Sequence, residues 1–304
     1  MNIKFPFRRL AITAIAASVF ILGACGGSGS ESADSVPASS ETTLKIVSLS
    51  PTATEMLYAI GAGNQVVAVD SLSTFPAEVA PKVTKISAYE PSAEAILAYE
   101  PDVVLISNDM NKITEQLTSA NPDIKVWTGA AAASLDDVYK QINELGALTG
   151  RVDSAEEVVS SMKARIDAIV PDEMPTVAFP VYYELDNTFY SLTSNTFVGA
   201  LMKQFGLVSI ADGAEKGNDY PQLNAEAIVK ADPAIIFLAD TKCCQQTAAT
   251  VAARAGWSGI SAVVNKNVVE LDDDIASRWG PRIVDLIEQF GKAHSAMLAK
   301  NATK

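Results

Sequence analysis

Short runs of apolar, often β-branched residues alternate along the chain with longer segments in which apolar residues recur every three or four positions. The short runs predict strands and the longer segments predict helices. Several short runs contain almost no polar residue, which is typical of parallel strands that are covered on both faces. The alternation therefore predicts an α/β fold with mainly parallel sheets. The predicted strands are Ile46–Leu49, Val66–Val69, Val103–Ser107, Lys125–Thr128, Thr176–Tyr182, Ile235–Ala239 and Val268–Leu271.

A helical turn followed by a strand occurs twice with nearly the same sequence. Ala93-Glu94-Ala95-Ile96 precedes the apolar run Pro101–Ile106, and Ala225-Glu226-Ala227-Ile228 precedes the run Asp232–Leu238. A single match of this kind arises easily by chance. A second shared element is needed before the two halves of the chain can be treated as related.

That second element lies upstream of each copy. We expect a strand, a polar turn and a helix from Val47–Thr52 to Gly61, and the same elements from Tyr190–Asn195 to Gly206. Glycine just past the last apolar turn is a common end of a helix. Because two elements recur in the same order, the sequence predicts two pseudo-symmetric α/β lobes.

A long helical stretch separates the two copies. Residues 134–170 contain no proline, and Gly146 and Gly150 are expected to interrupt the stretch in its middle. From Asp153 onwards the apolar residues form one stripe that ends at Val170, as on a helix with one buried face. At ~1.5 Å per residue this helix is about 25 Å long. We expect residues 44–141 to form the N-terminal lobe, 142–175 the bridging segment and 176–304 the C-terminal lobe.

The first 43 residues carry a different pattern. A basic start is followed by the apolar run Ala11–Ala24, which is shorter than the ~20 residues of a membrane-spanning helix but is typical of a signal peptide. The run ends in Leu22-Gly23-Ala24-Cys25, which resembles a bacterial lipobox. We expect residues 1–24 to be removed, Cys25 to carry lipid, and the polar residues 25–43 to form a flexible tether. The alternative is an ordinary secretory signal with an incidental cysteine.

The net charge narrows the range of partners. Residues 1–24 contain three basic and no acidic residues, so their removal changes the formal net charge from −13 to −16. An acidic body argues against nucleic acid and against adsorption to anionic lipid. After Cys25 the only cysteines are Cys243 and Cys244, so the chain is not a disulfide framework.

Three motifs together resemble a known family. They are Ser48-Leu49-Ser50-Pro51-Thr52-Ala53-Thr54-Glu55, the two Ala-Glu-Ala-Ile turns, and Trp279-Gly280-Pro281-Arg282. From about Lys45 to Met297 the chain resembles the substrate-binding proteins of ABC importers for ferric siderophores, haem and cobalamin. The resemblance implies two lobes bridged by one long helix, with the ligand in the cleft between them.

The resemblance also implies how the protein works. We expect a monomer that captures a small-molecule metal chelate without chemistry and without a cofactor, and delivers it to an ABC permease dimer with its ATPase subunits. Lipid on Cys25 would hold the protein to the outer face of the cell membrane. A ferric siderophore is the first candidate ligand, followed by cobalamin or another corrinoid and then haem. The few cationic residues of the candidate cleft favour a neutral hydroxamate over a trianionic catecholate.

Turns that follow the predicted strands supply the candidate ligand-binding residues, because open parallel sheets bind ligands beyond the carboxyl ends of their strands. Tyr89 and Tyr220 come first, since each precedes a repeat glutamate and facing aromatic rings hold a large, partly apolar ligand. Either tyrosine is alternatively a rim or core residue. Arg278 pairs either with an anionic ligand or with an aspartate of the run 272–274. The remaining candidates are Ser50, Pro51, Thr52, Phe75, Tyr182 and Trp279.

The turn at residues 50–52 has a further expected role. It opens a helix whose free N–H groups can bind a ligand oxygen. Thr52 and Glu55 have the spacing of a capping box.

Glu94 and Glu226 occupy matching positions in the two repeats. Each lies near the start of a predicted helix, where the helix dipole favours a carboxylate by ~0.3–1 kcal/mol. The resemblance implies a second role, in which each glutamate meets arginines of one permease subunit. Two equivalent anions on a pseudo-symmetric body suit a two-fold symmetric partner.

The adjacent cysteines Cys243 and Cys244 follow a predicted strand. A vicinal disulfide there would be strained. A ligand contact and a redox switch are the alternatives to a structural role, which is the interpretation we favour.

Other functions fit the sequence less well. Zinc and manganese importers of related architecture need several imidazoles, whereas His294 is the only histidine of the chain. Haem held by a histidine is disfavoured for the same reason, although a tyrosine ligand stays open. The sequence has no G-x-S-x-G turn, no phosphate-binding glycine loop and no plausible Ser-His-Asp set. An extracytoplasmic enzyme is therefore a distant alternative.

Overall fold

The computed structural model describes residues 44–302, so the predicted lipobox and tether lie outside the described residues. Two four-stranded sheets form the framework, with strand orders β2-β1-β3-β4 and β6-β5-β7-β8. Every pair of neighbouring strands is parallel. The strands are β1 (Ile46–Leu49), β2 (Val66–Val69), β3 (Val103–Ile106), β4 (Lys125–Thr128), β5 (Phe179–Glu184), β6 (Leu207–Ser209), β7 (Ile235–Leu238) and β8 (Val268–Glu270).

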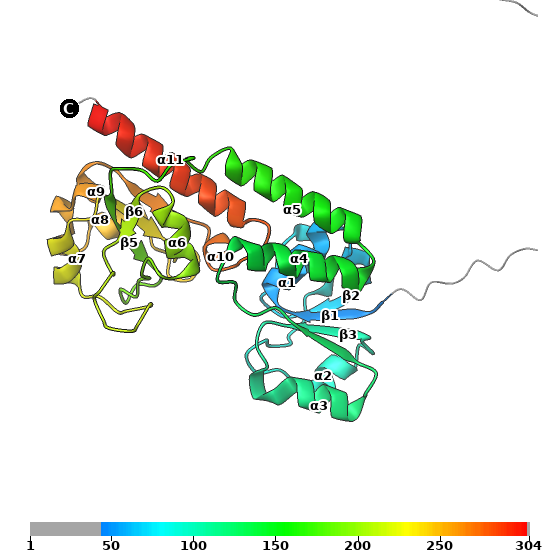
Figure 1. The fold of residues 1–304 in the computed structure, drawn as a ribbon. Helices are drawn as coiled ribbons and strands as arrows, with labels where there is room; N and C mark the ends of the chain where they lie inside the picture. The colour runs from blue at the N-terminus through cyan, green and yellow to red at the C-terminus, as the bar shows by residue number, and fades with distance from the viewer. Residues whose placement is uncertain (1–43, 303–304) are drawn as a thin grey trace, which may run out of the picture. The chain divides into compact units, whose positions relative to one another are not determined.

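Helices fill the connections between the strands (Figure 1). This arrangement confirms the predicted α/β fold with parallel sheets and two similar lobes. The helices are α1 (Pro51–Ala59), α2 (Ala93–Leu97), α3 (Ile113–Ala120), α4 (Leu135–Thr149), α5 (Val152–Asp167), α6 (Phe197–Lys203), α7 (Ala225–Ala231), α8 (Ala248–Ala252), α9 (Ser261–Val264), α10 (Asp273–Ala276) and α11 (Ile283–Ala302). Short 3₁₀ helices occupy Gly63–Gln65, Ala77–Lys82, Met110–Lys112 and Trp257–Gly259.

The N-terminal sheet, β1 to β4, is covered on both faces. Its central strands β1 and β3 are buried along their whole length. On one face Val104 and Ile106 pack with Ile113 and Leu117 of α3. Helices α1 and α4 cover the other face, as Figure 1 shows. Burial on both faces explains why β3 contains only apolar residues.

The C-terminal sheet, β5 to β8, has the same layered construction. On one face Tyr182 and Ile236 pack with Trp257 beneath α7, α8 and α9. On the other face Phe237 contacts Phe290 of α11, with ring centroids 5.1 Å apart. The two sheets are therefore built alike, as the sequence repeat predicted.

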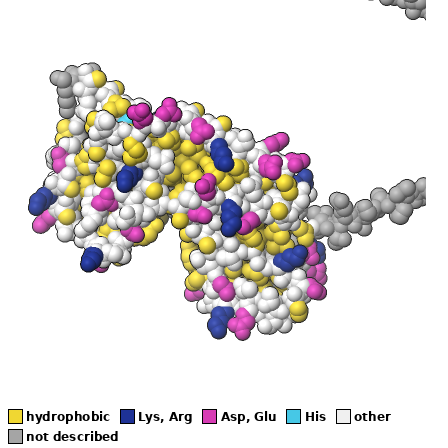
Figure 2. Space-filling model, viewed as in Figure 1, with side chains coloured by type: hydrophobic (Ala, Val, Ile, Leu, Met, Phe, Trp, Pro, Cys, Tyr) yellow, Lys and Arg dark blue, Asp and Glu magenta, His cyan; other side chains and the backbone are white. Residues whose placement is uncertain are grey.

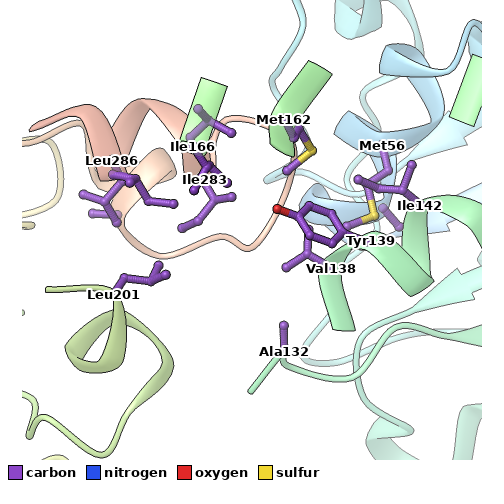
Figure 3. Close-up of a cluster of buried hydrophobic side chains, with 14 of the residues drawn as sticks. Met56, Ala132, Val138, Tyr139, Ile142, Met162, Ile166, Leu201, Ile283 and Leu286 are labelled. Carbon is purple, nitrogen blue, oxygen red and sulfur yellow. The ribbon is translucent and has the colours of Figure 1, made fainter. Parts of the chain in front are cut away.

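Helix α5 carries the chain from the N-terminal sheet towards the C-terminal one, and α11 packs beside it (Figure 1). Figure 3 shows the shared core: Met162 of α5 lies near Met56, whereas Ile166 of the same helix lies near Ile283 and Leu286. Arg165 of α5 also pairs with Asp285 and Glu288 of α11. One continuous apolar core thus joins both halves through α5 and α11.

Of the two glycines that were expected to interrupt the helical stretch, Gly150 does so and Gly146 does not. Gly150 ends α4 in the left-handed conformation, with φ of 69°. Gly146 does not interrupt the helix; it lies inside α4, where α5 comes very close. A Cβ at Gly146 would lie 2.5 Å from the Cβ of Ala155. The glycine therefore allows close packing of α4 on α5, and the predicted break there was wrong.

Three strand predictions need correction. Strand β5 was predicted at Thr176–Tyr182 but spans Phe179–Glu184. It can end on a buried glutamate because Glu184 forms an ion pair with Arg254. Tyr190–Asn195 is not a strand: apart from one bridge between Tyr190 and Gln222, it is irregular. Its backbone bonds to residues 219–221 instead of the sheet. Strand β6 is three residues long and was not predicted.

The start of α1 also differs from the prediction. Ser50, not Thr52, is the N-cap, and its Oγ accepts the N–H of Ala53 at 3.2 Å. Glu55 does not reach back to the cap. Its carboxylate accepts hydrogen bonds from the backbone N–H and the Nε–H of Arg282, at 3.0 and 2.9 Å. The proposed capping box was therefore wrong, because Glu55 holds the segment that precedes α11.

Within residues 44–302 no helix combines the length and the apolar character that crossing a membrane requires.

Candidate functional site

A cavity of about 520 Å³ lies at the carboxyl ends of β1 and β3, and we call it the edge cavity. This is where open parallel sheets commonly bind ligands. Residues 274–279, which follow the C-terminal sheet in the chain, close one side of it. Figure 2 shows that this side of the molecule is hollowed between the two halves. The lining residues are Leu49, Pro51, Thr52, Asp70, Leu72, Ala88, Tyr89, Pro91, Ile106, Ser107, Asn108, Met110, Ile113, Ala131, Asp274, Ser277, Arg278 and Trp279.

Five of the predicted ligand-binding residues line the edge cavity together: Pro51, Thr52, Tyr89, Arg278 and Trp279. Tyr89 is 67% exposed and presents most of its ring to solvent. The Nε1–H of Trp279 donates to Gln141 of α4 at 3.0 Å, which fixes the plane of the indole. An exposed tyrosine and an oriented tryptophan on one cavity suit a large, partly apolar ligand.

Ser50 lies just beneath this group instead of on the cavity surface. Its side chain is 1% exposed, and its Oγ accepts a hydrogen bond from Ser107 at 2.8 Å. The two hydroxyls join the ends of β1 and β3, so Ser50 supports the cavity floor. Its cap also occupies one of the helix N–H groups that were expected to be free for a ligand oxygen.

Arg278 is committed to protein acceptors. Its guanidinium pairs with Asp274 at 2.6 Å and donates to the backbone carbonyl of Leu72 at 3.2 Å. Of the two alternatives for Arg278, the described structure shows pairing with an aspartate. The bond to Leu72 also ties residues 274–279 to the N-terminal half.

Asp70 is a buried, charged cavity residue that the sequence analysis missed. It follows β2 directly and is fully buried. Its Oδ1 accepts the N–H of Ser73 at 3.0 Å, whereas Oδ2 has no hydrogen-bond partner among the described residues. Burial raises the pKa of Asp70, against smaller lowering effects from Ser73 and Arg278. An aspartate directly after an apolar strand was a usable signal, because that position falls on the carboxyl edge of the sheet.

Three predicted residues lie elsewhere. Phe75 lines a separate hollow of about 650 Å³ and stacks under Arg282, 3.7 Å from the ring centroid. Tyr182 is fully buried against Trp257, so its side chain is not available to a ligand. Tyr220 is 54% exposed but does not line the edge cavity. Of the two tyrosines that were predicted to face each other, Tyr89 lines the edge cavity and Tyr220 does not.

The carboxyl end of the C-terminal sheet is filled by its own side chains. Arg254 forms a bidentate ion pair with Glu184, with nitrogen–oxygen distances of 2.6 and 2.5 Å. Its guanidinium also lies over the ring of Trp257, 4.6 Å from the centroid. Asp240 is fully buried beside this pair, and neither of its carboxylate oxygens has a hydrogen-bond partner among the described residues. Burial, followed by the charge of Glu184, raises the pKa of Asp240 to about 7.

The adjacent cysteines lie at this closed end and are free thiols. The N–H of Cys243 donates to Asp273, and the N–H of Cys244 donates to the carbonyl of Asp240. Neither cysteine lines the edge cavity. Among the described residues, no group of three or more His, Cys, Asp or Glu side chains is arranged to hold a metal ion.

The two repeat glutamates occupy equivalent places on short helices. Glu94 lies in the first turn of α2, which Ser92 caps, and Glu226 lies in the first turn of α7, which Asn224 caps. Both side chains are exposed. The side chains of Ser92 and Asn224 each accept a hydrogen bond from a free N–H at the start of the helix. Neither glutamate is therefore needed to begin its helix.

Comparisons with known proteins agree with this architecture. The family model described as periplasmic binding protein matches residues 46–275. A Bacillus subtilis protein described as an uncharacterized ABC transporter substrate-binding lipoprotein, YvrC, is 32% identical over 260 residues, which cover 82% of this chain and 79% of that protein. A cobalamin-binding protein of Halobacterium salinarum is 31% identical over 258 residues, 82% of this chain and 69% of its own length.

A solved structure supports the same fold. The periplasmic haem-binding protein HutB of Vibrio cholerae superposes with a TM-score of 0.72 at 21% identity, over 83% of this chain and 98% of that one. At this level of identity the match speaks for the fold alone. The family match and the two relatives together show that this chain belongs to the periplasmic binding protein family.

Proposed function

We propose that this protein is the extracytoplasmic binding lipoprotein of an ABC importer, and that it captures a metal-bearing chelate or macrocycle in the edge cavity. The observation that carries the proposal is the cavity at the carboxyl ends of β1 and β3, which Tyr89 and Trp279 both line. The chain that forms it belongs to the periplasmic binding protein family. The mechanism is capture and release. No step of it changes a covalent bond of the ligand.

Two ligand classes have support. A neutral ferric hydroxamate fits a cavity in which the guanidinium of Arg278 is already paired with Asp274. A corrinoid is favoured by the Halobacterium salinarum relative, which is named a cobalamin-binding protein. Haem ranks third, because its propionates would need free cations at the cavity.

A binding panel separates these candidates. Cyanocobalamin, ferrioxamine B, ferric enterobactin, ferric citrate and haem are titrated into the purified protein by calorimetry and by intrinsic fluorescence. Saturable binding of cyanocobalamin or ferrioxamine B, with the probe recovered unchanged, supports the proposal. Absence of binding by all five, or conversion of a probe into product, contradicts it.

We further propose that Glu94 and Glu226 dock the protein on the two permease subunits, while lipid on Cys25 keeps it at the membrane. Both side chains are exposed on equivalent short helices, which suits a partner with two-fold symmetry. Within residues 44–302 no ion pair engages either of them, so both carboxylates are free to meet a cation of the partner.

Charge reversal tests the docking. The double variant Glu94→Arg/Glu226→Arg should abolish uptake in cells and leave the affinity for the bound probe unchanged. Glu115→Arg is the matched control, because Glu115 lies in the first turn of α3 and is also exposed. Normal uptake by the double variant would refute the docking role, and loss of probe affinity would place the glutamates in the binding site instead.

A further inference from the structure

The charge of the edge cavity restricts the ligand that it can hold. Among the described residues that line it, the carboxylates and basic side chains are Asp70, Asp274 and Arg278. Arg278 forms a salt bridge with Asp274 at 2.6 Å, and Asp274 also pairs with Lys242 at 2.9 Å. Asp70 has no ion pair among the described residues, and the two aspartates and the arginine together give the lining a formal charge of −1.

Asp70 has a hydrogen-bond acceptor that nothing in the described structure uses. Its Oδ1 accepts the N–H of Ser73, but its Oδ2 has no partner. The residue is 0% exposed and nevertheless lies on the wall of the cavity. Buried polar atoms are nearly always paired, and an unpaired one costs the desolvation of that group. A buried carboxylate on the wall of a cavity, with one oxygen unpaired, therefore points to a donor that arrives from outside the chain.

Among the described residues that line the cavity, Arg278 is the one cation that could fill this role, but its contacts are elsewhere. Its guanidinium donates to Asp274 and to the carbonyl of Leu72. The bond to Leu72 holds the arginine next to the turn that carries Asp70, without reaching the free oxygen. The local structure thus leaves the Oδ2 acceptor of Asp70 open.

On the proposed binding function, we propose that Asp70 is a specificity-determining residue of the edge cavity. It accepts a hydrogen bond from an N–H or O–H group of an uncharged or cationic ligand. It also excludes ligands that place a carboxylate or phenolate at that point, because two anions would then meet in a buried site. Carboxamide-rich corrinoids and amine- or amide-bearing hydroxamate chelates present such donors without a negative charge, whereas tris-catecholates and haem propionates present anionic oxygens.

The test uses ligands that differ in charge on a constant scaffold. Ferrioxamine B, its N-acetyl derivative and its N-succinyl derivative carry a cation, no charge and an anion at the same amine. Cyanocobalamin and the monocarboxylates obtained by hydrolysis of one amide form a second series. In the wild-type protein, affinity should fall from cation to anion, or from carboxamide to carboxylate.

The variant Asp70→Asn should remove this preference. Asparagine keeps an Oδ1 acceptor for Ser73, so the turn is preserved, and thermal unfolding verifies the fold. We expect the affinity for the favoured probe to fall by about ten- to hundredfold, as for loss of a hydrogen bond to a charged group, and the anionic derivative to bind as well as the neutral one. Asp123→Asn, at an exposed aspartate of the same half that does not line the cavity, should change neither value.

The outcomes separate the two proposals. If the wild-type protein binds neither scaffold in any charge state, the proposed function fails, and this inference fails with it. If one scaffold binds but its anionic member is held as tightly as the cationic or neutral one, the role of Asp70 alone is refuted. The same conclusion follows if Asp70→Asn folds normally and keeps the wild-type order of affinities.

Discussion

The carboxyl ends of the two sheets occupy equivalent places in the fold but differ in what they hold. In the N-terminal sheet the last paired residues of the central strands are Leu49 and Ile106, and in the C-terminal sheet they are Glu184 and Leu238. Leu49 borders the open edge cavity, whereas Glu184 is fully buried in an ion pair with Arg254. The same topology therefore gives one open end and one closed end.

The residues just beyond these strands explain the difference. At the open end Ser50 and Ser107 join the strands through a hydrogen bond between two small side chains. At the closed end Arg254 fills the equivalent space and stacks on Phe189 and Trp257. Small side chains leave room for a ligand, and large paired ones replace it. The pseudo-symmetry of the fold thus does not extend to the side chains at the carboxyl ends of the two sheets.

The largest expected effect comes from breaking the closed end. Arg254→Ala leaves the buried carboxylate of Glu184 without its partner, which costs about 3–5 kcal/mol of unfolding free energy. Arg165→Ala is the control, because Arg165 pairs with Asp285 and Glu288 while its side chain is 45% exposed. An exposed pair contributes about 0–1 kcal/mol. Urea denaturation of both variants tests this, and equal losses would contradict the buried ion pair as a main stabilising element of the closed end.

The second effect is a pH dependence at the closed end. Burial and Glu184 raise the pKa of Asp240 to about 7, so the folded state binds the proton more tightly than the unfolded state does. Wild-type stability should therefore fall as the pH rises from about 4 to about 7. Asp240→Asn removes this loss and should be the more stable protein above pH 7, by about 1–3 kcal/mol. Denaturation of both proteins at pH 5 and pH 8 measures this difference in unfolding free energy. If the unfolding free energies of the two proteins changed in parallel with pH, Asp240 would already be ionised at the lower pH.

The third effect is on ligand affinity and separates the two tyrosines of the sequence analysis. Tyr89 lines the edge cavity and Tyr220 does not. Tyr89→Ala should weaken binding of cyanocobalamin or ferrioxamine B by about three- to tenfold, as for loss of an aromatic contact. Tyr220→Ala should weaken it less. If the Tyr220 variant loses more affinity in calorimetry, the C-terminal half supplies the principal aromatic contact.

The smallest effect concerns the stability of the helix starts. Glu94→Arg replaces an anion by a cation in the first turn of α2, which costs about 0.3–1 kcal/mol through the helix dipole. Glu115→Arg in α3 should cost a similar amount, because the pair that Glu115 also forms with Lys112 is exposed and contributes only about 0–1 kcal/mol. Equal, small changes in the thermal unfolding of the two variants, together with an uptake defect in Glu94→Arg alone, would separate docking from a dipole effect. A loss of several kcal/mol of unfolding free energy in Glu94→Arg would show instead that Glu94 has a structural role.

The sequence predicted the strands well where their residues are all apolar, as in β2, β3 and β7. It failed where a polar residue is buried by a distant partner. Strand β5 was ended too early because its last residue is Glu184, whose burial depends on Arg254, 70 positions later. For the same reason Tyr182, on that strand, was placed at the cleft although it is part of the core.

The candidate site was predicted in part. Tyr89, Arg278 and Trp279 were chosen because they follow strands or carry a recognised motif, and all three line the edge cavity. Their partners could not be read from the sequence, because the contacts of Arg278 with Leu72 and of Trp279 with Gln141 join segments 206 and 138 positions apart. Asp70 could have been found, since it follows a predicted strand directly.

The most direct test of the open and closed ends is hydrogen exchange of the backbone amides, measured by mass spectrometry with and without saturating cyanocobalamin or ferrioxamine B. We predict slower exchange on binding in residues 70–72, 88–91, 106–110 and 274–279, which line the edge cavity. Residues 182–184 and 240–247 at the closed end should exchange at the same rate in both states. Protection concentrated at the closed end, with none at the edge cavity, would contradict the account.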